Sequence, residues 1–309
     1  GLRRRVVLRR WSIAASLIVP LLICVLYLNG RQIIPEIPGR QLERIVPGIS
    51  TAQLYLPDGN VVDLGKDSVC DLQLLEGGRF VNERGTLTYK GDSSEVKVAQ
   101  YSEVRIPRGG EYKVVLPDGT IVWLNAESSL RFPTLFTGKE RKVYAKGELY
   151  FDVKHDDTKP FIVEVEKDYL VRVLGTEFNL RAYSGFPVVT TLVEGKVKVN
   201  DQDIVAGEQA VYSKNDGKTT VRQVEVEQYV AWQEGTFVFR NERLENVMKT
   251  LGRWYGVEFH FIDERAKEIR IGARFGRYDD MQPIVDMIKK TNLVEVLQTN
   301  RCLYISEKK

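Results

Sequence analysis

The stretch QLYLPDGNVVDLGKDSVCDL, residues 53–72, decides the fold, because it returns sixty residues later as KVVLPDGTIVWLNAESSLRF, residues 113–132. The two stretches align without a gap and share Leu-Pro-Asp-Gly, followed by matching valine, leucine and serine positions. In Pro-Asp-Gly, proline presets φ, aspartate bonds the nearby backbone and glycine accepts a positive φ, so the repeat predicts two tight turns. The turn residues are Pro57, Asp58, Gly59, Pro117, Asp118 and Gly119. We therefore interpret both aspartates as hairpin-tip residues and not as a pair of catalytic carboxylates.

Residues 50–230, which contain this repeat, follow a pattern of short strands. Apolar and polar residues alternate at 95–98, 112–116 and 161–165, and glycine-rich turn signals separate such runs. No long helical period interrupts them, which predicts an all-β domain. Stacked hairpins in a sandwich, a barrel-like roll and a short β-solenoid all fit this pattern.

Residues 231–309 change to a mixed period. A strand at 235–239 is followed by a helix that Asn241 can cap, and a second helix carries Pro283 in its first turn. The apolar positions of the two helices, at three-four spacing, are Leu244, Val247, Met248, Leu251, Trp254, Tyr255, Ile284, Val285, Met287 and Ile288. With two strands between the helices and two after them, the order is β-α-β-β-α-β-β, a small α+β domain in which we expect Trp254 to be core.

Residues 11–28, WSIAASLIVPLLICVLYL, carry no charge. As a helix they would be roughly 27 Å long, close to the hydrocarbon thickness of a bilayer. A cleaved signal peptide would need a small-x-small site, which the following residues do not offer. The preceding residues 1–10 are basic, and short basic flanks stay cytoplasmic while long domains cross the membrane. The arginines that set this topology are Arg3, Arg4, Arg5, Arg9 and Arg10.

The sequence therefore predicts a cytoplasmic basic stub (1–10), a single transmembrane helix (11–28), a Pro/Gly-containing tether (29–49) and a large domain on the outer side. Within the predicted helix, Ser12, Ser16, Pro20 and Cys24 recur every four positions and form one stripe. Pro20 removes one helical hydrogen bond, and small residues allow another helix to approach closely. The stripe is a candidate cleavage or contact face; a monomeric anchor with incidental serines fits equally well.

Composition excludes some classes of function. The net charge is +3, and the five amino-terminal arginines supply more than this, so we expect no nucleic-acid partner. Three cysteines do not make a disulfide framework. Cys302 lies in an alternating run, where we expect a small core residue.

No pattern typical of catalysis is present. The chain has two histidines; His260 lies between two phenylalanines, where strand alternation predicts that it faces solvent. Neither histidine has a ligand-spaced Cys, His or carboxylate neighbour along the chain, and neither a nucleophile elbow nor a phosphate loop occurs. We therefore expect no enzymatic activity, no metal, no cofactor and no catalytic residue. Binding through surfaces remains, including the addition of a strand to an exposed sheet edge.

Specific strings resemble FecR-type transmembrane anti-sigma factors. The strings are GEYKVVLPDGTIVWLNAESSLRFP (110–133), KGELYFDV (146–153), VLGTEFNLRAY (173–183), TTLVEGKVKV (190–199) and AGEQAVYS (206–213). RNERLENVMKTLGRWYGVEFHF (240–261) is similar to the carboxy-terminal module that follows in many members. The resemblance covers nearly all of residues 50–306, in the family's order.

The resemblance implies a single-pass protein of the inner membrane of a Gram-negative bacterium, with its bulk in the periplasm. It implies that the periplasmic part binds the signalling domain of a TonB-dependent outer-membrane transporter, whose fold is similar to the β-α-β-β-α-β-β tail. It also implies that a cytoplasmic segment holds an extracytoplasmic-function (ECF) sigma factor, and that envelope proteases release this factor to control transcription of uptake genes.

This sequence departs from the family pattern in the segment before the predicted membrane span. Ten residues precede Trp11, and we expect ten residues to be too few for a sigma-binding helical domain. The sigma-binding segment is therefore not expected within this chain. An alternative function is a non-regulatory envelope scaffold that uses the same β domain.

Overall fold

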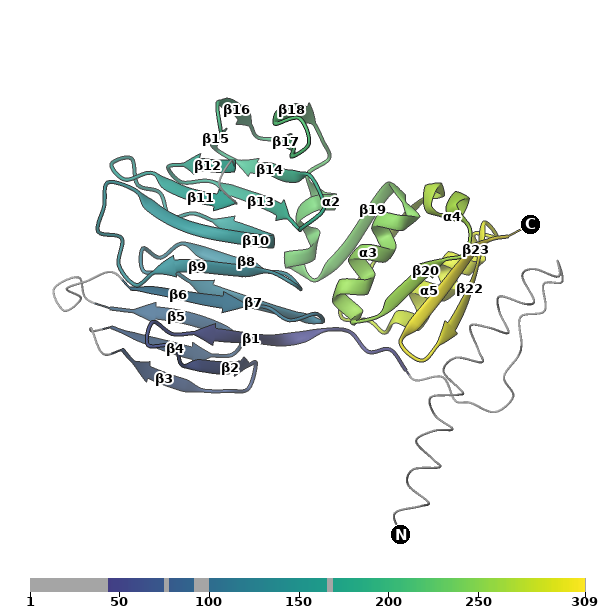
Figure 1. Cartoon of the computed structure of the whole chain (residues 1–309), viewed down its shortest axis with the longest axis horizontal. Coiled ribbons are helices and arrows are strands. Elements are labelled where there is room, and N and C mark those ends of the chain that lie inside the picture. Colours follow the sequence, from purple (N-terminus) through teal and green to yellow (C-terminus); the bar gives the residue numbers. More distant parts are fainter. Residues whose placement is uncertain (1–43, 75–77, 92–99, 166–168, 309) are drawn as a thin grey trace, which may run out of the picture. The chain divides into compact units, whose positions relative to one another are not determined.

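The computed structural model describes residues 44–74, 78–91, 100–165 and 169–308. Strands β1 to β18 form a mainly-β domain, and a small α+β domain follows it (Figure 1). This confirms the predicted order of a mainly-β part and a small α+β part. Among the described residues no helix is long and apolar enough to span a membrane. The predicted span (11–28), its stripe and the five arginines lie outside the described residues and stay predictions.

The strands of the β domain are short and follow one another closely. The first nine are β1 (Ile49–Tyr55), β2 (Val61–Gly65), β3 (Cys70–Gln73), β4 (Arg79–Glu83), β5 (Thr86–Lys90), β6 (Tyr101–Arg105), β7 (Gly110–Val115), β8 (Ile121–Leu124) and β9 (Ser129–Pro133). The other nine are β10 (Arg141–Asp152), β11 (Phe161–Val165), β12 (Tyr169–Val173), β13 (Glu177–Ala182), β14 (Val188–Glu194), β15 (Lys196–Val199), β16 (Gln202–Val205), β17 (Glu208–Ser213) and β18 (Lys218–Gln223).

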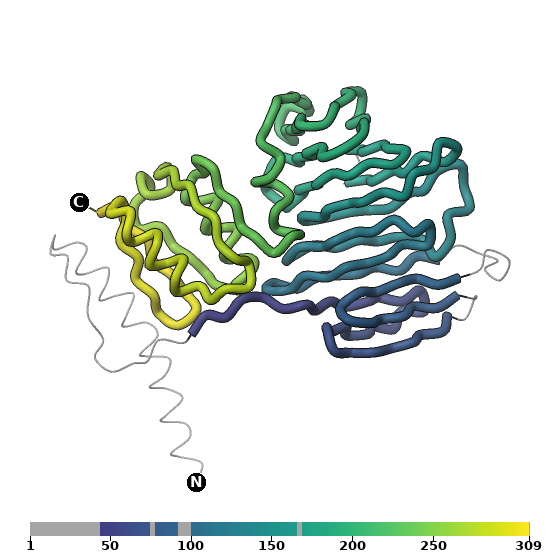
Figure 2. Tube along the Cα trace, turned by 180° about the vertical axis from the view of Figure 1, so that it is seen from behind, coloured from purple at the N-terminus to yellow at the C-terminus, as the bar shows by residue number. Residues whose placement is uncertain are grey.

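Strand pairing divides the β domain into two runs that share β10 and are also joined where the start of β1 pairs with β7. One run is β2-β1-β6-β9-β10-β11-β12-β15-β16, and the other is β3-β4-β5-β7-β8-β10-β13-β14-β17-β18. Buried and less buried residues alternate along strands such as β7, and the buried ones of both runs form one core. The architecture is thus a sandwich of two sheets, along which the chain advances from β1–β4 to β15–β18 as in a solenoid (Figures 1 and 2).

The two Leu-Pro-Asp-Gly turns have matching geometry at the tips of β1–β2 and β7–β8. Asp58 accepts a hydrogen bond from the Asn60 backbone N–H at 2.9 Å, and Asp118 accepts one from the Thr120 N–H at 3.1 Å. The second turn does more, because Asp118 also pairs at 2.8 Å with the side chain of Arg141, which is buried. The repeated aspartates are therefore turn residues here, and one of them also satisfies a buried arginine.

Strand β10 passes from one sheet to the other at Gly147. Residues 144–146 pair with β9, and residues 147–152 pair with β13. Gly147 has φ +88°, and a Cβ placed there would lie 2.6 Å from the Cα of Ser128. Only glycine allows this turn between the sheets without backbone movement.

We expect Gly147→Ala to lower the free energy of unfolding by about 1–3 kcal/mol, because it combines a strained φ with overlap against backbone. Chemical denaturation of the full chain measures this loss. Gly138→Ala is the matched control, since a Cβ at Gly138 has no neighbour closer than 3.9 Å. Equal stability of the two variants would contradict the role of Gly147.

The carboxy-terminal domain consists of two small sheets and three helices, preceded by α2 (Glu227–Val230) and the 3₁₀ helix η1 (Ala231–Glu234). Its elements are β19 (Thr236–Arg243), α3 (Leu244–Tyr255), β20 (Glu258–Phe261), α4 (Glu264–Glu268), β21 (Arg270–Gly276), α5 (Met281–Lys290), β22 (Val294–Thr299) and β23 (Cys302–Glu307). β19 pairs with β21, and the second sheet has the order β20-β23-β22.

Two details differ from the prediction. The observed order is β-α-β-α-β-α-β-β, with one helix, α4, that the sequence pattern did not predict. This helix has five residues and buries only Ala266, so its sequence shows no apolar period. Asn241 does not cap α3, because β19 continues to Arg243 and Asn241 takes φ +50° at a bulge. The apolar face of α3 is correct: Trp254 and Tyr255 are each 1% exposed in the domain core.

Candidate functional site

The segment that precedes β1 contacts the carboxy-terminal domain. Ile45 is 4% exposed and belongs to that domain's core, and its carbonyl accepts a hydrogen bond from the Met281 N–H at 3.2 Å. Gly48 lies so close to Trp254 that a Cβ would be 2.7 Å from the indole ring. Residues 44–48, part of the predicted tether, are therefore packed, and the chain reaches the β domain only after this contact.

A loop of the β domain holds the carboxyl end of α3. Arg108 Nε donates to the Gly252 carbonyl at 3.1 Å and its Nη2 donates to the Val257 carbonyl. The Gly109 N–H donates to the Arg253 carbonyl at 2.8 Å. The last carbonyls of a helix lack partners within the helix and carry partial negative charge, so an arginine and a backbone N–H suit this position.

Arg277, directly after β21, is the centre of the contact between the two domains. Its side chain is 0% exposed, and its guanidinium lies 3.7 Å from the centre of the Trp254 ring. Its Nε pairs with Glu111 at 3.1 Å and its Nη2 donates to Asn125 Oδ1 at 2.5 Å. Burial lowers the pKa of Arg277, while nearby Glu111 and Glu148 oppose that shift. A buried arginine needs such acidic partners, because an unpaired charge would be too costly.

Further polar groups extend this contact into the β domain. Glu148, 8% exposed on β10, accepts hydrogen bonds from Asn125 Nδ2 at 2.8 Å and from Asn179 Nδ2 at 3.3 Å. Asn179 in turn accepts the indole N–H of Trp232, in η1, at 3.0 Å. Tyr278, a residue 57% exposed, donates to Glu111 at 2.8 Å, and partial desolvation of its hydroxyl together with that carboxylate raises the pKa of Tyr278 to about 12. We call this connected set of groups, together with residues 44–48 and the loop residues Arg108 and Gly109, the junction.

The junction positions the parts that it joins. The hydrogen bonds given above link its polar groups, while Nη1 of Arg277 is buried without a hydrogen-bond partner, in a guanidinium that lies against the Trp254 ring. A buried hydrogen-bonded network favours one arrangement of the parts that it joins. The junction therefore sets how the β domain, the carboxy-terminal domain and residues 44–48 are held together.

The second sheet of the carboxy-terminal domain has edges at β20 and β22. β22 pairs only with β23 among the described strands. The Lys308 N–H donates to the Leu293 carbonyl at 3.0 Å, and alternation from this pair directs the backbone N–H of Val294 and Val296 away from β23. An edge strand whose N–H groups face away from its neighbour is a template for an added strand.

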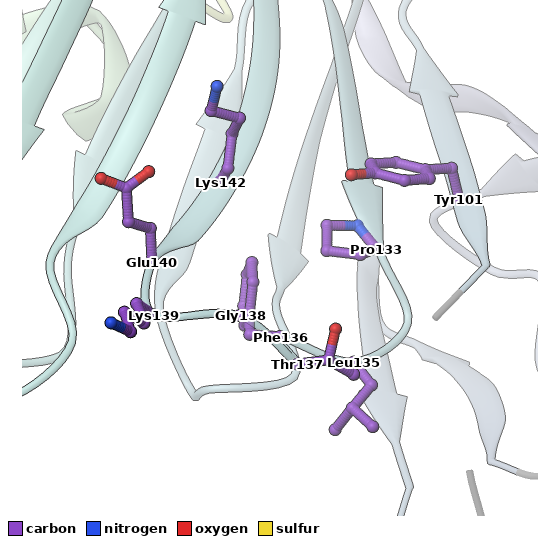
Figure 3. Close-up of a pocket in the computed structure, with 9 residues that line it drawn as sticks. All are labelled: Tyr101, Pro133, Leu135, Phe136, Thr137, Gly138, Lys139, Glu140 and Lys142. Carbon is purple, nitrogen blue, oxygen red and sulfur yellow. The ribbon is translucent and has the colours of Figure 1, made fainter. Parts of the chain in front are cut away.

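A shallow depression of about 480 Å³ lies beside the loop between β9 and β10, lined by residues that include Pro133, Phe136 and Lys142 (Figure 3). Two of the three charged groups that line it pair elsewhere: Lys142 pairs with Glu164 at 3.0 Å, and Glu140 pairs with Arg172 at 2.9 Å. A small-molecule site requires polar groups that converge on the cavity, and these two pairs point against one here.

One cluster was missed by the sequence analysis. Glu258, His260 and Cys302 have potential ligand atoms that all lie within 4.8 Å of one another. His260 is exposed, as expected, but Cys302 is half-buried on the same outward face and is not a core residue. Spacing along the chain could not show this cluster, because it forms only when β20 pairs with β23.

These features define a class: a two-sheet β domain joined through a buried polar junction to a small α+β domain with an open sheet edge. The family model "FecR protein" matches residues 102–198, and the model "FecR, C-terminal" matches residues 236–305. The chain belongs to the FecR family.

Solved structures of similar fold come from Parabacteroides distasonis ATCC 8503. A crystal structure at 1.65 Å resolution of a proposed anti-sigma factor has 26% sequence identity and a TM-score of 0.62, covering 67% of this chain and 99% of that chain. A structure at 2.50 Å with the same description has 26% identity and a TM-score of 0.61, covering 68% of this chain and 100% of that chain. Among curated proteins none matches this chain.

Proposed function

We propose that this protein is an anti-sigma regulator of the bacterial envelope that acts by binding and not by catalysis. The observation that carries the proposal is the pair of FecR domains in order, together with the similarity to a proposed anti-sigma factor over two thirds of the chain. In this proposal residues 11–28 cross the inner membrane and the described domains lie in the periplasm.

The proposed partner on the periplasmic side is the signalling domain of a TonB-dependent transporter, which adds a strand at the edge of β22. The outward N–H groups of this strand support that mode, because backbone pairing needs little side-chain specificity. On the cytoplasmic side the proposed partner is an ECF sigma factor, which envelope proteases release.

In this proposal the junction couples binding of the partner at β22 to the chain segment that leads to the membrane. Residues 44–48 belong to the predicted tether that follows the predicted span, and they pack against the same small domain that presents β22. A partner that shifts the carboxy-terminal domain would therefore change the hold on the segment next to the membrane. This coupling requires two arrangements of the junction with different affinity for the partner.

The test uses the full chain as bait against the periplasmic signalling domains of the transporters encoded beside its gene. Capture of one of them supports the relay, and failure against all of them counts against it. A reporter of the adjacent operon, with and without the intact gene, separates regulation from the scaffold alternative: an unchanged reporter supports the scaffold.

We expect Val296→Pro to weaken binding of the captured signalling domain by roughly tenfold or more, since proline removes an outward N–H and blocks strand addition. Proline is tolerated at an edge position whose N–H faces outward, so the domain should fold. Val296 is 8% exposed, and Val296→Ala loses the same packing but keeps the N–H, so it serves as the matched control in the same binding measurement. Equal affinity of the two variants would place the partner elsewhere.

A further inference from the structure

Three metal-binding side chain types converge on the outward face of the second sheet of the carboxy-terminal domain. β20 and β23 run parallel, with Glu258 opposite Cys302 and His260 opposite Tyr304. The neighbouring Phe259 and the residues that alternate with it turn toward the core, so the three polar side chains share the other face. A carboxylate oxygen, an imidazole nitrogen and a thiol sulfur therefore lie within 4.8 Å of one another.

We propose that Glu258, His260 and Cys302 bind a divalent transition metal ion, with Zn²⁺ as the best fit. Thiolate and imidazole select zinc over magnesium and calcium, which prefer oxygen ligands alone. Zinc bonds of about 2.0–2.3 Å place tetrahedral ligands roughly 3.3–3.7 Å apart, a spacing that side-chain rotation reaches from 4.8 Å. Three protein ligands leave the fourth position for water.

The surroundings suit this ion. The Tyr304 ring stacks on His260 with centroids 5.4 Å apart and 30° between planes, which restrains the imidazole. One thiolate and one carboxylate balance the two positive charges of the ion. A thiol binds the ion as the thiolate, so binding releases the proton of Cys302. The bound ion would link edge strand β20 to β23.

The test is titration of the untagged, reduced full chain with Co²⁺, which reports thiolate ligation by a near-ultraviolet charge-transfer band and four-coordination by intense visible bands. We expect saturation at a single equivalent and displacement by Zn²⁺. Cys302→Ser and His260→Gln should abolish the charge-transfer band or weaken binding by roughly tenfold or more. Absence of the band in the unaltered chain would overturn the proposal.

The chain supplies matched controls. Cys70 is also half-buried, and His155 is the second histidine, so Cys70→Ser and His155→Gln should leave the spectrum unchanged. A band that survives Cys302→Ser, or is lost with Cys70→Ser, would assign the ion to another site and contradict the proposal.

A measurement on the unaltered chain avoids any folding defect of a variant. Zn²⁺ should slow alkylation of Cys302 while Cys70 reacts at the same rate with and without the ion, as read by mass spectrometry of the two peptides. Zn²⁺ should also raise the melting temperature in a concentration-dependent way. Equal alkylation of Cys302 with and without Zn²⁺ would overturn the site.

Discussion

Replacing Arg277 by methionine should lower the free energy of unfolding by about 3–5 kcal/mol, because it removes the counter-charge of the half-buried Glu111 and the buried Glu148. Glu111 loses its ion pair at 3.1 Å, and Asn125 loses the guanidinium on its Oδ1. The buried Glu148 loses a nearby positive charge. Denaturant unfolding followed by tryptophan emission measures the effect, since Trp232 and Trp254 both lie at the junction.

Arg274→Met is the matched control for this experiment. Arg274 lies in β21, three residues before Arg277. Its side chain is 61% exposed and pairs with Glu227. An exposed ion pair contributes little, so this variant should stay close to the unaltered chain. Similar losses for both arginines would show that burial at the junction does not matter.

Replacing Ile45 by alanine should release residues 44–48 from the carboxy-terminal domain. Truncation of a buried isoleucine costs about 2–5 kcal/mol, and this segment has few other apolar contacts to hold it. Cleavage within 44–48 by a protease should then rise by at least about tenfold, because cleavage follows the population of the opened segment. Limited proteolysis of the full chain with amino-terminal sequencing measures this rise.

The chain offers a control of the same residue type four positions on. Ile49 is 66% exposed at the start of β1, so Ile49→Ala should leave the cleavage rate unchanged. If Ile45→Ala and Ile49→Ala are cleaved equally, the contact of residues 44–48 with the carboxy-terminal domain is not what protects them. In the proposed relay, Ile45→Ala should also alter the reporter of the adjacent operon without any transporter signal.

Turn geometry, strand alternation and helical period, which depend on a few neighbouring residues, predicted much of the fold from the sequence. The Pro-Asp-Gly turns follow from proline and glycine geometry, and the strands around them follow from alternation over a few residues. The apolar period of α3 placed Trp254 and Tyr255 in a core, where each is 1% exposed. The same rules failed at α4, since five residues with one buried alanine carry no period.

These local patterns could not predict whether the β domain is a sandwich, a roll or a solenoid. Alternation shows which face of a strand is buried but not which strand lies opposite, and in this domain β10 changes sheet at Gly147. Ser128, whose backbone leaves no room for a Cβ at Gly147, lies in the turn between β8 and β9. Pairing between strands far apart in the chain decided the architecture.

By itself the sequence determined the β-rich and α+β parts, their order, the turns and the family strings, because each depends on neighbours within a few residues. Only the tertiary structure decided that Arg277 lies buried beside Glu111, 166 residues away, and that Ile45 joins the carboxy-terminal core. It likewise placed Cys302 beside His260. Arginine is usually exposed and cysteine usually buried, so residue type predicts the opposite of both placements. The physical reason is that a buried charge or a shared ligand site depends on the partner groups, and strand pairing across the whole chain brings those partners together.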